Sequence, residues 1–370
     1  MIKLENLTKK FPGLERPAVD HLNLEIEDGD ICVLVGPSGC GKTTTLKMIN
    51  RLHEPDGGEI YLNGEPTSEL DEIELRRGIG YVIQEIGLFP HMSIMENIST
   101  VPRELDWPED RIEERVEKLM EMVGLDPDIY WGRLPAALSG GQRQRVGVAR
   151  ALAADPPVLL MDEPFGAVDP ITRASLQNEF LRLQDQMDKT IVFVTHDINE
   201  AIKMGDKVAV LKEGKLVQYS SPQELLDAPA DEFVAQLVGK NRSIKRLHLI
   251  RVEEIVEEEQ EEITVVRNCS REEMEKTLEK CADDVLCVVD ENGCLLGRID
   301  KEALREEGEC AEDLMDEFSE TVTADSTLND ALSVMLECGE GFVPVIDEEI
   351  GKFHDVITLQ DLLEEVREGK

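Results

Sequence analysis

A glycine-rich stretch near the N-terminus has the residue types and spacing of a phosphate-binding loop. Residues 36–43 read Gly-Pro-Ser-Gly-Cys-Gly-Lys-Thr, which fits the pattern G-x-x-x-x-G-K-[ST], and they follow the apolar run Ile31–Val35. Glycines let the backbone curl so that successive N–H groups point at phosphate oxygens, and a helix that begins near Lys42 adds its positive dipole end. In this pattern the lysine reaches the β- and γ-phosphates, and the Thr43 hydroxyl ligates Mg²⁺. The motif therefore predicts a nucleotide phosphate site that works with Mg²⁺.

Two further apolar runs end in residues that can act on a phosphate. The run Val158–Met161 ends at Asp162 and Glu163. Asp162 suits the Mg²⁺ shell, while Glu163 could accept a proton from a water molecule that attacks the γ-phosphate. The run Ile191–Val194 leads to His196 at what would be the same sheet edge. Acids that merely end a strand and a structural histidine are the alternatives, and the phosphate loop favours the catalytic interpretation of both.

A second anion site is indicated at residues 138–142, which read Leu-Ser-Gly-Gly-Gln and precede an arginine-rich helical stretch. A serine and two glycines at a helix start offer N–H groups and the positive end of the helix dipole to an anion. One ATP does not need two such sites from one subunit. We therefore expect a second protomer to be involved.

The elements that must position these residues follow from the pattern of apolar runs over the first 240 residues. Four runs lack the period-2 alternation of a half-exposed strand, which is typical of strands buried on both faces. They are Ile31–Val35, Val158–Met161, Ile191–Val194 and Val208–Leu211. Helical spacing appears between them, at Arg111–Val123 and Arg173–Gln186. The pattern predicts a largely parallel sheet with helices on both faces.

The length of the chain and the distribution of its charges indicate more than one domain. At roughly 100–200 residues per domain, 370 residues predict two or three domains. From Asn241 onward the chain carries 37 acidic and 14 basic residues, a net charge of −23, and the boundary near Gly239 is followed by the basic stretch Lys240–Arg251 and the acidic run 253–262. Beyond it, Val285–Asp290 and Phe342–Asp347 begin two similar stretches of about 60 residues that each read strand, turn, strand, helix. Two such copies packed together would bury an apolar face that neither buries alone.

The overall composition excludes several classes of protein. The chain has 79 acidic and 39 basic residues, and a net charge of −40 argues against general nucleic-acid binding. The start Met1–Asn6 lacks the features of a signal peptide, and no apolar run approaches the ~20 residues that span a bilayer. Eight cysteines without a C-x-x-C pair favour reduced thiols. We expect a cytoplasmic chain that reaches the membrane through a partner; its acidity fits either a high-salt cytoplasm or a surface kept soluble by charge.

Taken together, the three motifs resemble the ATP-binding subunit of ATP-binding cassette (ABC) transporters, in order over residues 1–240. The resemblance implies ATP and Mg²⁺ as cofactors and an α/β fold: a P-loop NTPase domain with a parallel-sheet core and a helical subdomain. It also implies a homodimer that sandwiches ATP head to tail. The nucleotide-binding residues that it implies are Phe11, which would stack on adenine, and Gly36, Pro37, Ser38, Gly39, Cys40, Gly41, Lys42, Thr43 and Thr44.

The remaining site residues also follow from the resemblance. Glu163, His196 and Gln84 correspond to catalytic residues, and Thr43, Gln84 and Asp162 to Mg²⁺ ligands. Asp169 matches the loop that crosses the dimer, where the family prefers Leu at the position of Val168. The segment that would contact the γ-phosphate of the opposite protomer consists of Ser139, Gly140, Gly141 and Gln142.

The type of transporter is indicated by two other segments. Glu85–Ile98 resembles the importer segment that receives a coupling helix, and the C-terminal repeat resembles a pair of CBS domains, which are α+β. This combination is similar to the osmoprotectant branch, whose substrates are quaternary amines such as glycine betaine, carnitine, choline or proline betaine. It implies transmembrane permease subunits, an extracellular or periplasmic substrate-binding protein, and a peripheral place on the cytoplasmic face of the membrane. The alternatives are an importer for another solute, such as an amino acid or a metal complex, and a soluble ABC ATPase of translation or DNA repair.

The expected domains are the ABC ATP-binding domain at 1–240, a charged linker at 241–262, a degenerate CBS repeat at 263–307 and a second CBS repeat at 308–370. The family's adenosine-binding pattern is G-h-h-[ST]-x-x-D. The second copy keeps Thr358 and Asp361 but lacks the glycine, whereas the first copy keeps Gly297 and lacks both polar residues. Three roles stay open for the pair: binding an adenine or cyclic dinucleotide, sensing salt without a ligand, and dimerisation.

Overall fold

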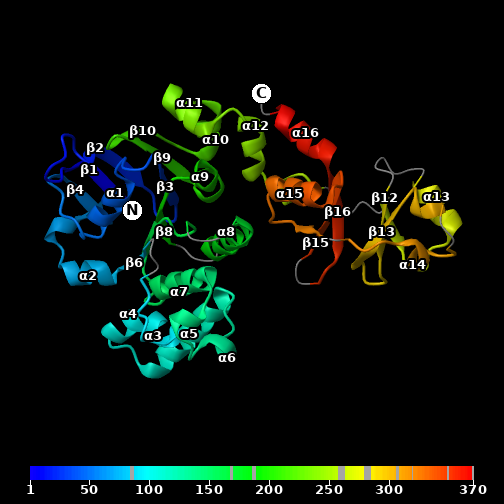
Figure 1. Cartoon of the computed structure of the whole chain (residues 1–370), viewed down its shortest axis with the longest axis horizontal. Helices are drawn as coiled ribbons and strands as arrows, with labels where there is room; N and C mark the ends of the chain where they lie inside the picture. Colours follow the sequence, from blue (N-terminus) through cyan, green and yellow to red (C-terminus); the bar gives the residue numbers. More distant parts are fainter. Residues whose placement is uncertain are drawn as a thin grey trace. The chain divides into compact units, whose positions relative to one another are not determined.

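The chain forms two compact units, Met1–Lys240 and Asn241–Lys370 (Figure 1). The structure is a computed structural model that describes residues 1–83, 87–166, 170–185, 189–256, 263–278, 285–305, 308–318, 320–347 and 350–368. No helix in these described ranges is long and apolar enough to cross a membrane.

A six-stranded sheet is the centre of the first unit. Its strands are β3 (Ile31–Val35), β6 (Ile79–Val82), β7 (Val158–Asp162), β8 (Thr190–Thr195), β9 (Lys207–Lys212) and β10 (Lys215–Ser220). They lie in the order β10-β9-β3-β8-β7-β6, and all neighbours are parallel except β10 and β9. Every residue of β3, β7 and β8 is buried, which confirms the prediction of parallel strands covered on both faces.

A second, antiparallel sheet faces the first across helix α1 (Lys42–Ile49). Its strands are β1 (Ile2–Lys9), β2 (Val19–Ile26), β4 (Gly57–Leu62) and β5 (Glu65–Pro66), in the order β2-β1-β4-β5. Leu4 of β1, Leu46 of α1 and Leu34 of β3 belong to one buried core. Helix α1 is thus packed between the two sheets, which holds the loop before it in place.

The opposite face of the six-stranded sheet is covered by helices. Successive strand residues point to opposite faces, so Phe193 of β8 points away from α1 while Val192 joins the core around it. The Phe193 ring contacts Phe165 at 5.8 Å, and Phe165 contacts Phe180 of helix α8 (Pro170–Asp185) at 6.4 Å between ring centroids. The first unit also contains the helices α2 (Glu72–Arg77), α9 (Ile198–Met204), α10 (Pro222–Asp227) and α11 (Glu232–Val238).

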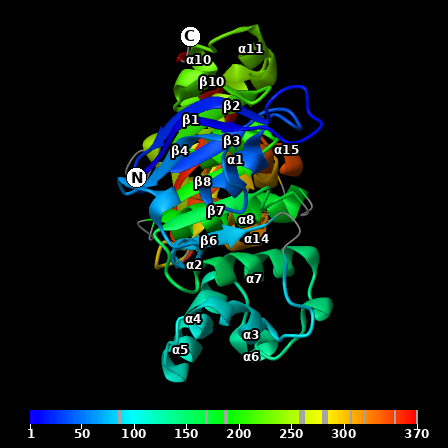
Figure 2. The same cartoon turned by 90° about the vertical axis from the view of Figure 1, so that its left-hand side faces the viewer.

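A layer of helices lies at the β6 side of the six-stranded sheet, below it in Figure 2. It contains α3 (Ile94–Ile98), α4 (Thr100–Glu104), α5 (Glu109–Met122), α6 (Pro127–Tyr130) and α7 (Gly140–Leu152). Ile112 and Val116 of α5 are fully buried, as is Val146 of α7. This layer confirms the expected helical subdomain.

The second unit contains two three-stranded sheets of identical topology. They are β11 (Thr264–Val266), β12 (Val285–Val289) and β13 (Leu295–Asp300), and β14 (Val322–Thr323), β15 (Phe342–Ile346) and β16 (Phe353–Thr358). In each sheet the first strand runs parallel to the second, and the third runs antiparallel to it. The helices are α13 (Arg271–Leu278), α14 (Ala311–Leu314), α15 (Leu328–Cys338) and α16 (Leu359–Glu368).

The segment expected as part of a charged linker is instead packed on the second repeat. It forms helix α12 (Arg242–Lys245) and two short 3₁₀ helices, η3 (Arg246–His248) and η4 (Val252–Glu254), and it buries Leu247 and Val252 in the core of that repeat. The Val252 N–H donates to the Ser326 carbonyl at 2.8 Å. These apolar residues lie between charged ones, and burying them outweighs the solvation of the chain as a free linker.

The start of the range expected for the second repeat packs on the first repeat instead. Its residues Ala311 and Leu314 belong to the buried core of the first repeat. The Ala311 N–H donates to the Cys269 carbonyl at 3.1 Å. Each repeat is therefore completed by a segment from outside its own expected range.

Candidate ATP-binding site

The phosphate loop connects β3 to α1 and depends on two glycines for its path. Gly36 has φ 152° and Gly41 has φ 107°. A Cβ atom at Gly36 would lie 2.2 Å from the Leu211 carbonyl oxygen, and one at Gly41 would lie 2.4 Å from that of Ala18. Only glycine fits at these positions, because the loop is pressed against neighbouring backbone.

Lys42 and Thr43 begin helix α1 at the mouth of this loop. The Lys42 side chain is 6% exposed, and its ammonium donates to the carbonyl oxygens of Gly36 at 2.6 Å and Pro37 at 3.2 Å. The loop thus encloses a buried positive charge, which suits the binding of a polyphosphate. Thr44, also expected at the nucleotide, is half-buried beside them.

Thr43 and Asp162 form the site that could hold Mg²⁺. The Thr43 hydroxyl donates to Asp162 Oδ1 at 2.9 Å, across the gap between α1 and the end of β7. Asp162 is 4% exposed; burial raises its pKa, the nearby Glu163 raises it further, and the Thr43 hydrogen bond lowers it. Both groups are hard oxygen donors of the kind that Mg²⁺ binds, and a cation here would relieve the cost of burying the carboxylate.

These two oxygens fit Mg²⁺ only together with phosphate and water ligands, which is how Mg²⁺ is usually bound at nucleotide sites. Among the residues that the structure describes, no group of three or more His, Cys, Asp or Glu side chains could hold a metal by itself. The expected third ligand, Gln84, lies outside the described residues, as does Asp169 of the expected dimer loop.

Glu163 and His196 meet where β7 and β8 end side by side. Glu163 adopts a left-handed backbone, φ 46°, and its N–H donates to the Val194 carbonyl at 2.9 Å, so the chain turns directly after the strand. Glu163 Oε1 then lies 3.2 Å from His196 Nδ1, and the two side chains are 20% and 64% exposed. Non-glycine residues rarely adopt this backbone, and active sites are one of the places where they do. The structure therefore brings together the two side chains that the sequence placed at one sheet edge.

The signature segment, residues 138–142, opens helix α7 in the helical layer. Ser139 is the N-cap: its Oγ accepts the Gln142 N–H at 3.2 Å, and Gln142 Oε1 accepts the Ser139 N–H at 2.9 Å. This reciprocal capping fixes the first turn and leaves the N–H groups of Gly140 and Gly141 directed out of the helix end. Ser139 is exposed, and the segment can present an anion site on the surface.

Phe11, the residue expected to stack on adenine, is half-buried just after β1. Its ring packs edge-on against His53 with 5.3 Å between the ring centroids, and Lys9 Nζ lies 5.7 Å from the ring centroid. The Lys9 ammonium is itself held by Asp56 at 3.0 Å. These contacts keep the ring in place at the surface.

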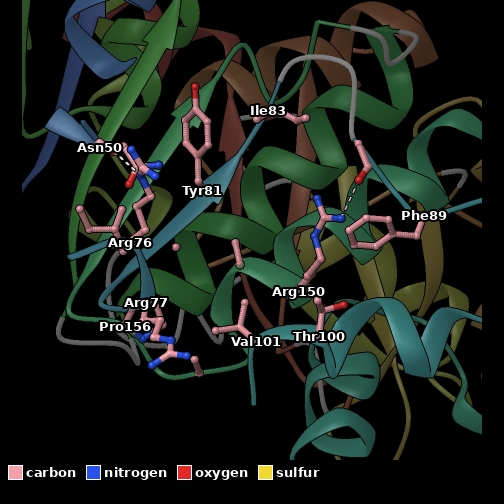
Figure 3. A pocket seen from close by; sticks show the side chains of 15 residues that line it. Asn50, Arg76, Arg77, Tyr81, Ile83, Phe89, Thr100, Val101, Arg150 and Pro156 are labelled. Carbon is pink, nitrogen blue, oxygen red and sulfur yellow. Dashed lines mark hydrogen bonds between the residues drawn. The ribbon is translucent and has the colours of Figure 1, made fainter. Parts of the chain in front are cut away.

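A groove of about 350 Å³ lies between the sheet and the helical layer (Figure 3). Tyr81 of β6 lines it from the sheet side, and Phe89 and Arg150 line it from the helical side. Phe89 is 40% exposed, yet its backbone is held at both ends by Asn97: its N–H donates to Asn97 Oδ1 at 2.8 Å, and its carbonyl accepts from Asn97 Nδ2 at 3.1 Å. Arg150 donates to the Gly87 carbonyl at 2.7 Å. The groove thus contains part of the segment 85–98 that was expected to receive a coupling helix.

Two of the residues that line the groove each have a buried polar atom without a hydrogen-bond partner among the described residues. The two atoms are Asn50 Oδ1, on a side chain that is 5% exposed, and the Tyr81 hydroxyl. A buried polar group without a hydrogen-bond partner costs stability. Sequence reasoning missed these two residues and Arg150, because no motif marks them.

In the second unit, Thr358 and Asp361 form a helix cap. Asp361 Oδ2 accepts from both the N–H and the hydroxyl of Thr358 at 2.8 Å, and the Asp361 N–H donates to Thr358 Oγ1 at 3.3 Å. At the matching place in the first repeat, Asp300 Oδ1 accepts the N–H groups of Glu302 and Ala303 at 2.8 Å. The pattern residues at both places thus account for helix starts without a ligand.

Comparison with known proteins agrees with this site. Residues 19–166 match the ABC transporter family, and residues 311–368 match the CBS domain family. The osmoprotectant import ATP-binding protein OsmV of Salmonella typhimurium is 47% identical, over 100% of this chain and 97% of that protein. The glycine betaine/carnitine/choline transport ATP-binding protein OpuCA of Bacillus subtilis is also 47% identical, over 94% of this chain and 92% of that protein.

Among solved structures, the dimeric ABC transporter cassette MJ0796 is 36% identical to this chain, with a TM-score of 0.55 over 60% of this chain and 99% of that one. A second structure of MJ0796 is a dimer in a post-hydrolysis state, bound to ADP and Pi. With 47% identity to a transport ATP-binding protein over its whole length, this chain belongs to the family of ATP-binding subunits of ABC transporters, in the osmoprotectant import branch with a C-terminal CBS region.

Proposed function

We propose that this chain hydrolyses ATP to drive the import of quaternary amine osmoprotectants such as glycine betaine, carnitine, choline or proline betaine. The observation that carries the proposal is the meeting of three strand ends: the phosphate loop after β3, Asp162 and Glu163 after β7, and His196 after β8. The full-length similarity to proteins named for osmoprotectant and glycine betaine transport supports the substrate class.

Within one subunit, each group has a separate task. Lys42 and the loop N–H groups hold the phosphates, while Thr43 and Asp162, together with Gln84, would hold Mg²⁺, which would neutralise charge on the phosphate oxygens. Glu163 takes a proton from the attacking water. His196 Nδ1 lies 3.2 Å from Glu163 Oε1, so an imidazolium at this place pairs with that carboxylate and donates its Nε2–H to the γ-phosphate.

The rest of each site comes from a second copy of the chain. Ser139 and Gly141 contact the γ-phosphate that the partner's loop holds, Asp169 crosses the interface, and Phe11 stacks on adenine. The dimeric form of MJ0796 supports this arrangement. Binding of ATP would close the dimer, closure would drive the membrane subunits from inward- to outward-facing, and hydrolysis would reset them.

The groove around Phe89, Tyr81 and Arg150 is the docking place for a helix of the transmembrane permease. Its position between the two layers would let a rotation of the helical layer move the docked helix. The subunit then sits on the cytoplasmic face of the membrane, held by the permease, while an extracellular or periplasmic binding protein delivers the amine.

The C-terminal unit regulates this activity. Its net charge of −23 supports a response to ionic strength. Binding of an adenine or cyclic dinucleotide and simple dimerisation are the alternatives, and the capping role of Thr358 and Asp361 weighs against the nucleotide.

Copurification tests the proposal as a whole. A tagged subunit should bring down permease subunits and an amine-binding protein, and the complex in proteoliposomes should accumulate radiolabelled glycine betaine, carnitine or choline only with ATP inside. The same complex with Glu163→Gln is the control and should accumulate none. Uptake of an amino acid but of no quaternary amine would overturn the substrate class, and a subunit that recovers no membrane protein would overturn the transport function.

A further inference from the structure

A hydroxyl group from another helix is bonded to the signature segment. Gln142 Nε2 donates to the Tyr130 hydroxyl oxygen at 2.9 Å, while Gln142 Oε1 accepts the Ser139 N–H at 2.9 Å. The amide is therefore bonded at both ends, and each atom has a partner of the right polarity. Tyr130 lies twelve residues before Gln142 and is half-buried.

Tyr130 is held in place by the contacts of α6 and Arg133. It is the last residue of α6, whose start is capped by Asp126 through the Asp128 N–H at 2.9 Å. The Arg133 guanidinium lies 4.9 Å from the centre of the Tyr130 ring, and the Arg133 carbonyl accepts the Ile94 N–H at 2.9 Å. The ring is thus fixed against both α6 and the start of α3.

We propose that Tyr130 is a positioning residue for the ATP site of the partner subunit. Through Gln142 it sets the capping geometry of Ser139, whose Oγ accepts the Gln142 N–H and whose hydroxyl proton is then left for a phosphate oxygen. This rests on the proposed role of the signature segment across the dimer.

The proposal predicts a defect in dimer closure but not in ATP binding by a monomer. Tyr130→Phe keeps the ring and its Arg133 contact and removes only the hydroxyl. The Tyr130–Gln142 bond lies within one subunit, so its loss weakens dimer formation through the altered position of the Ser139 hydroxyl, and we take the worth of one neutral hydrogen bond, about two- to tenfold, as the size of that effect. In a Glu163→Gln background, the ATP concentration for half-maximal dimer formation should rise by about that factor, measured by analytical ultracentrifugation, while ATP affinity at protein concentrations too low to dimerise stays the same.

A matched control is Tyr219→Phe in the same background. The Tyr219 hydroxyl donates to the Glu25 carbonyl, also at 2.9 Å, but on β10 of the sheet. This variant should dimerise as the parent does. Gln142→Leu removes the amide, and Tyr130→Phe added to it should have no further effect, because the two residues act as one unit.

Mixed dimers show whether Tyr130→Phe weakens the ATP site of the partner subunit or both ATP sites alike. When Tyr130→Phe and Lys42→Ala are on different chains, the one complete phosphate loop faces an intact signature segment. When both changes are on one chain with an unchanged partner, that loop faces the altered segment, and ATP-driven heterodimerisation should be two- to tenfold weaker than in the first arrangement. Equal affinities, or the reverse order, would overturn the inference.

The same data keep the inference distinct from the function on which it rests. A Glu163→Gln parent that never dimerises with ATP would overturn the proposed dimer and this inference with it. A parent that dimerises at the same ATP concentration as its Tyr130→Phe variant would overturn the inference alone.

Discussion

Replacing Glu163 by glutamine removes a proton acceptor while keeping the shape of the side chain. Its backbone is fixed by the hydrogen bond from its N–H to the Val194 carbonyl and by its left-handed φ of 46°, neither of which depends on the carboxylate. The amide oxygen can still accept from His196 Nδ1, now 3.2 Å away. We therefore expect Glu163→Gln to fold and to bind ATP normally.

Turnover should fall by a factor on the order of 10² or more, because general base catalysis contributes typically 10²–10⁴-fold. At about 1.4 kcal/mol per tenfold, this corresponds to roughly 3–5 kcal/mol of lost transition-state stabilisation. The Mg²⁺ site should not be lost with it: Glu163 helps to raise the pKa of Asp162, so removing its charge favours the ionised Asp162 carboxylate. The ATP-bound dimer should accumulate.

The assay is steady-state ATP hydrolysis at saturating Mg²⁺ and ATP, with gel filtration to detect the dimer. Glu213→Gln is a matched control, since Glu213 also has a left-handed backbone, φ 50°, but is 64% exposed and pairs with Arg16. It should keep full activity. Normal turnover by a Glu163→Gln subunit, with the substitution verified by mass spectrometry, would remove Glu163 from the mechanism.

Three other predictions concern the metal site and the C-terminal unit. Burial raises the pKa of Asp162, so the folded state favours the neutral carboxyl group and loses stability as pH rises through that pKa. Without nucleotide at neutral pH, Asp162→Asn should therefore unfold at a higher temperature than the parent, and Mg²⁺ with ATP should not raise that temperature further. A lower unfolding temperature than that of the parent would refute this. Thr358→Ala with Asp361→Ala should lower the free energy of unfolding of the C-terminal unit by about 1–2 kcal/mol in urea titrations, and an unchanged midpoint would show that the cap is not needed. Deleting the residues after Gly239 should leave ATP binding intact and flatten the salt dependence of transport. The reason is that salt screens the charges of the C-terminal unit, since the Debye length falls from about 10 Å at 0.1 M to about 3 Å at 1 M. A truncated complex that keeps the full salt response would contradict regulation by the acidic unit.

The sheet of the first unit could be predicted from the sequence because its strands are buried on both faces. Ile31–Val35 has the same bounds as β3, and Val158–Met161 differs from β7 by the final residue. The antiparallel sheet could not be recognised in this way. β2, for example, alternates buried and exposed residues over a short length, and it pairs antiparallel with β1.

At the site, sequence reasoning was successful where chain order alone decides the geometry. Parallel strands end at one edge, so Glu163 and His196 were expected together, and they lie 3.2 Å apart. Tyr130 was missed because the role that we propose for it depends on how α6 and α7 approach each other. A tyrosine twelve residues before Gln142 has no distinguishing pattern until α6 and α7 are placed.

The second unit shows the same limit. Its internal repeat could be read from the order of apolar runs, and the two sheets share one topology. The packing of the flanking segments could not, since Leu247 passes over the first repeat to pack on the second, and Ala311 packs on the first although it lies within the range expected for the second. The apolar residues of the segment 242–256 could not be recognised as core residues because charged residues lie between them in the sequence.

The central claim is that each ATP lies between the phosphate loop of one subunit and the signature segment of the other. Hydrolysis by mixed dimers of a Ser139→Arg subunit and a Lys42→Ala subunit tests it most directly, because each homodimer has two damaged sites while the mixed dimer has one site free of both changes. We predict that the mixture hydrolyses ATP well above either parent. A mixture no more active than its parents, although gel filtration of differently tagged subunits shows that heterodimers have formed, would contradict the head-to-tail arrangement.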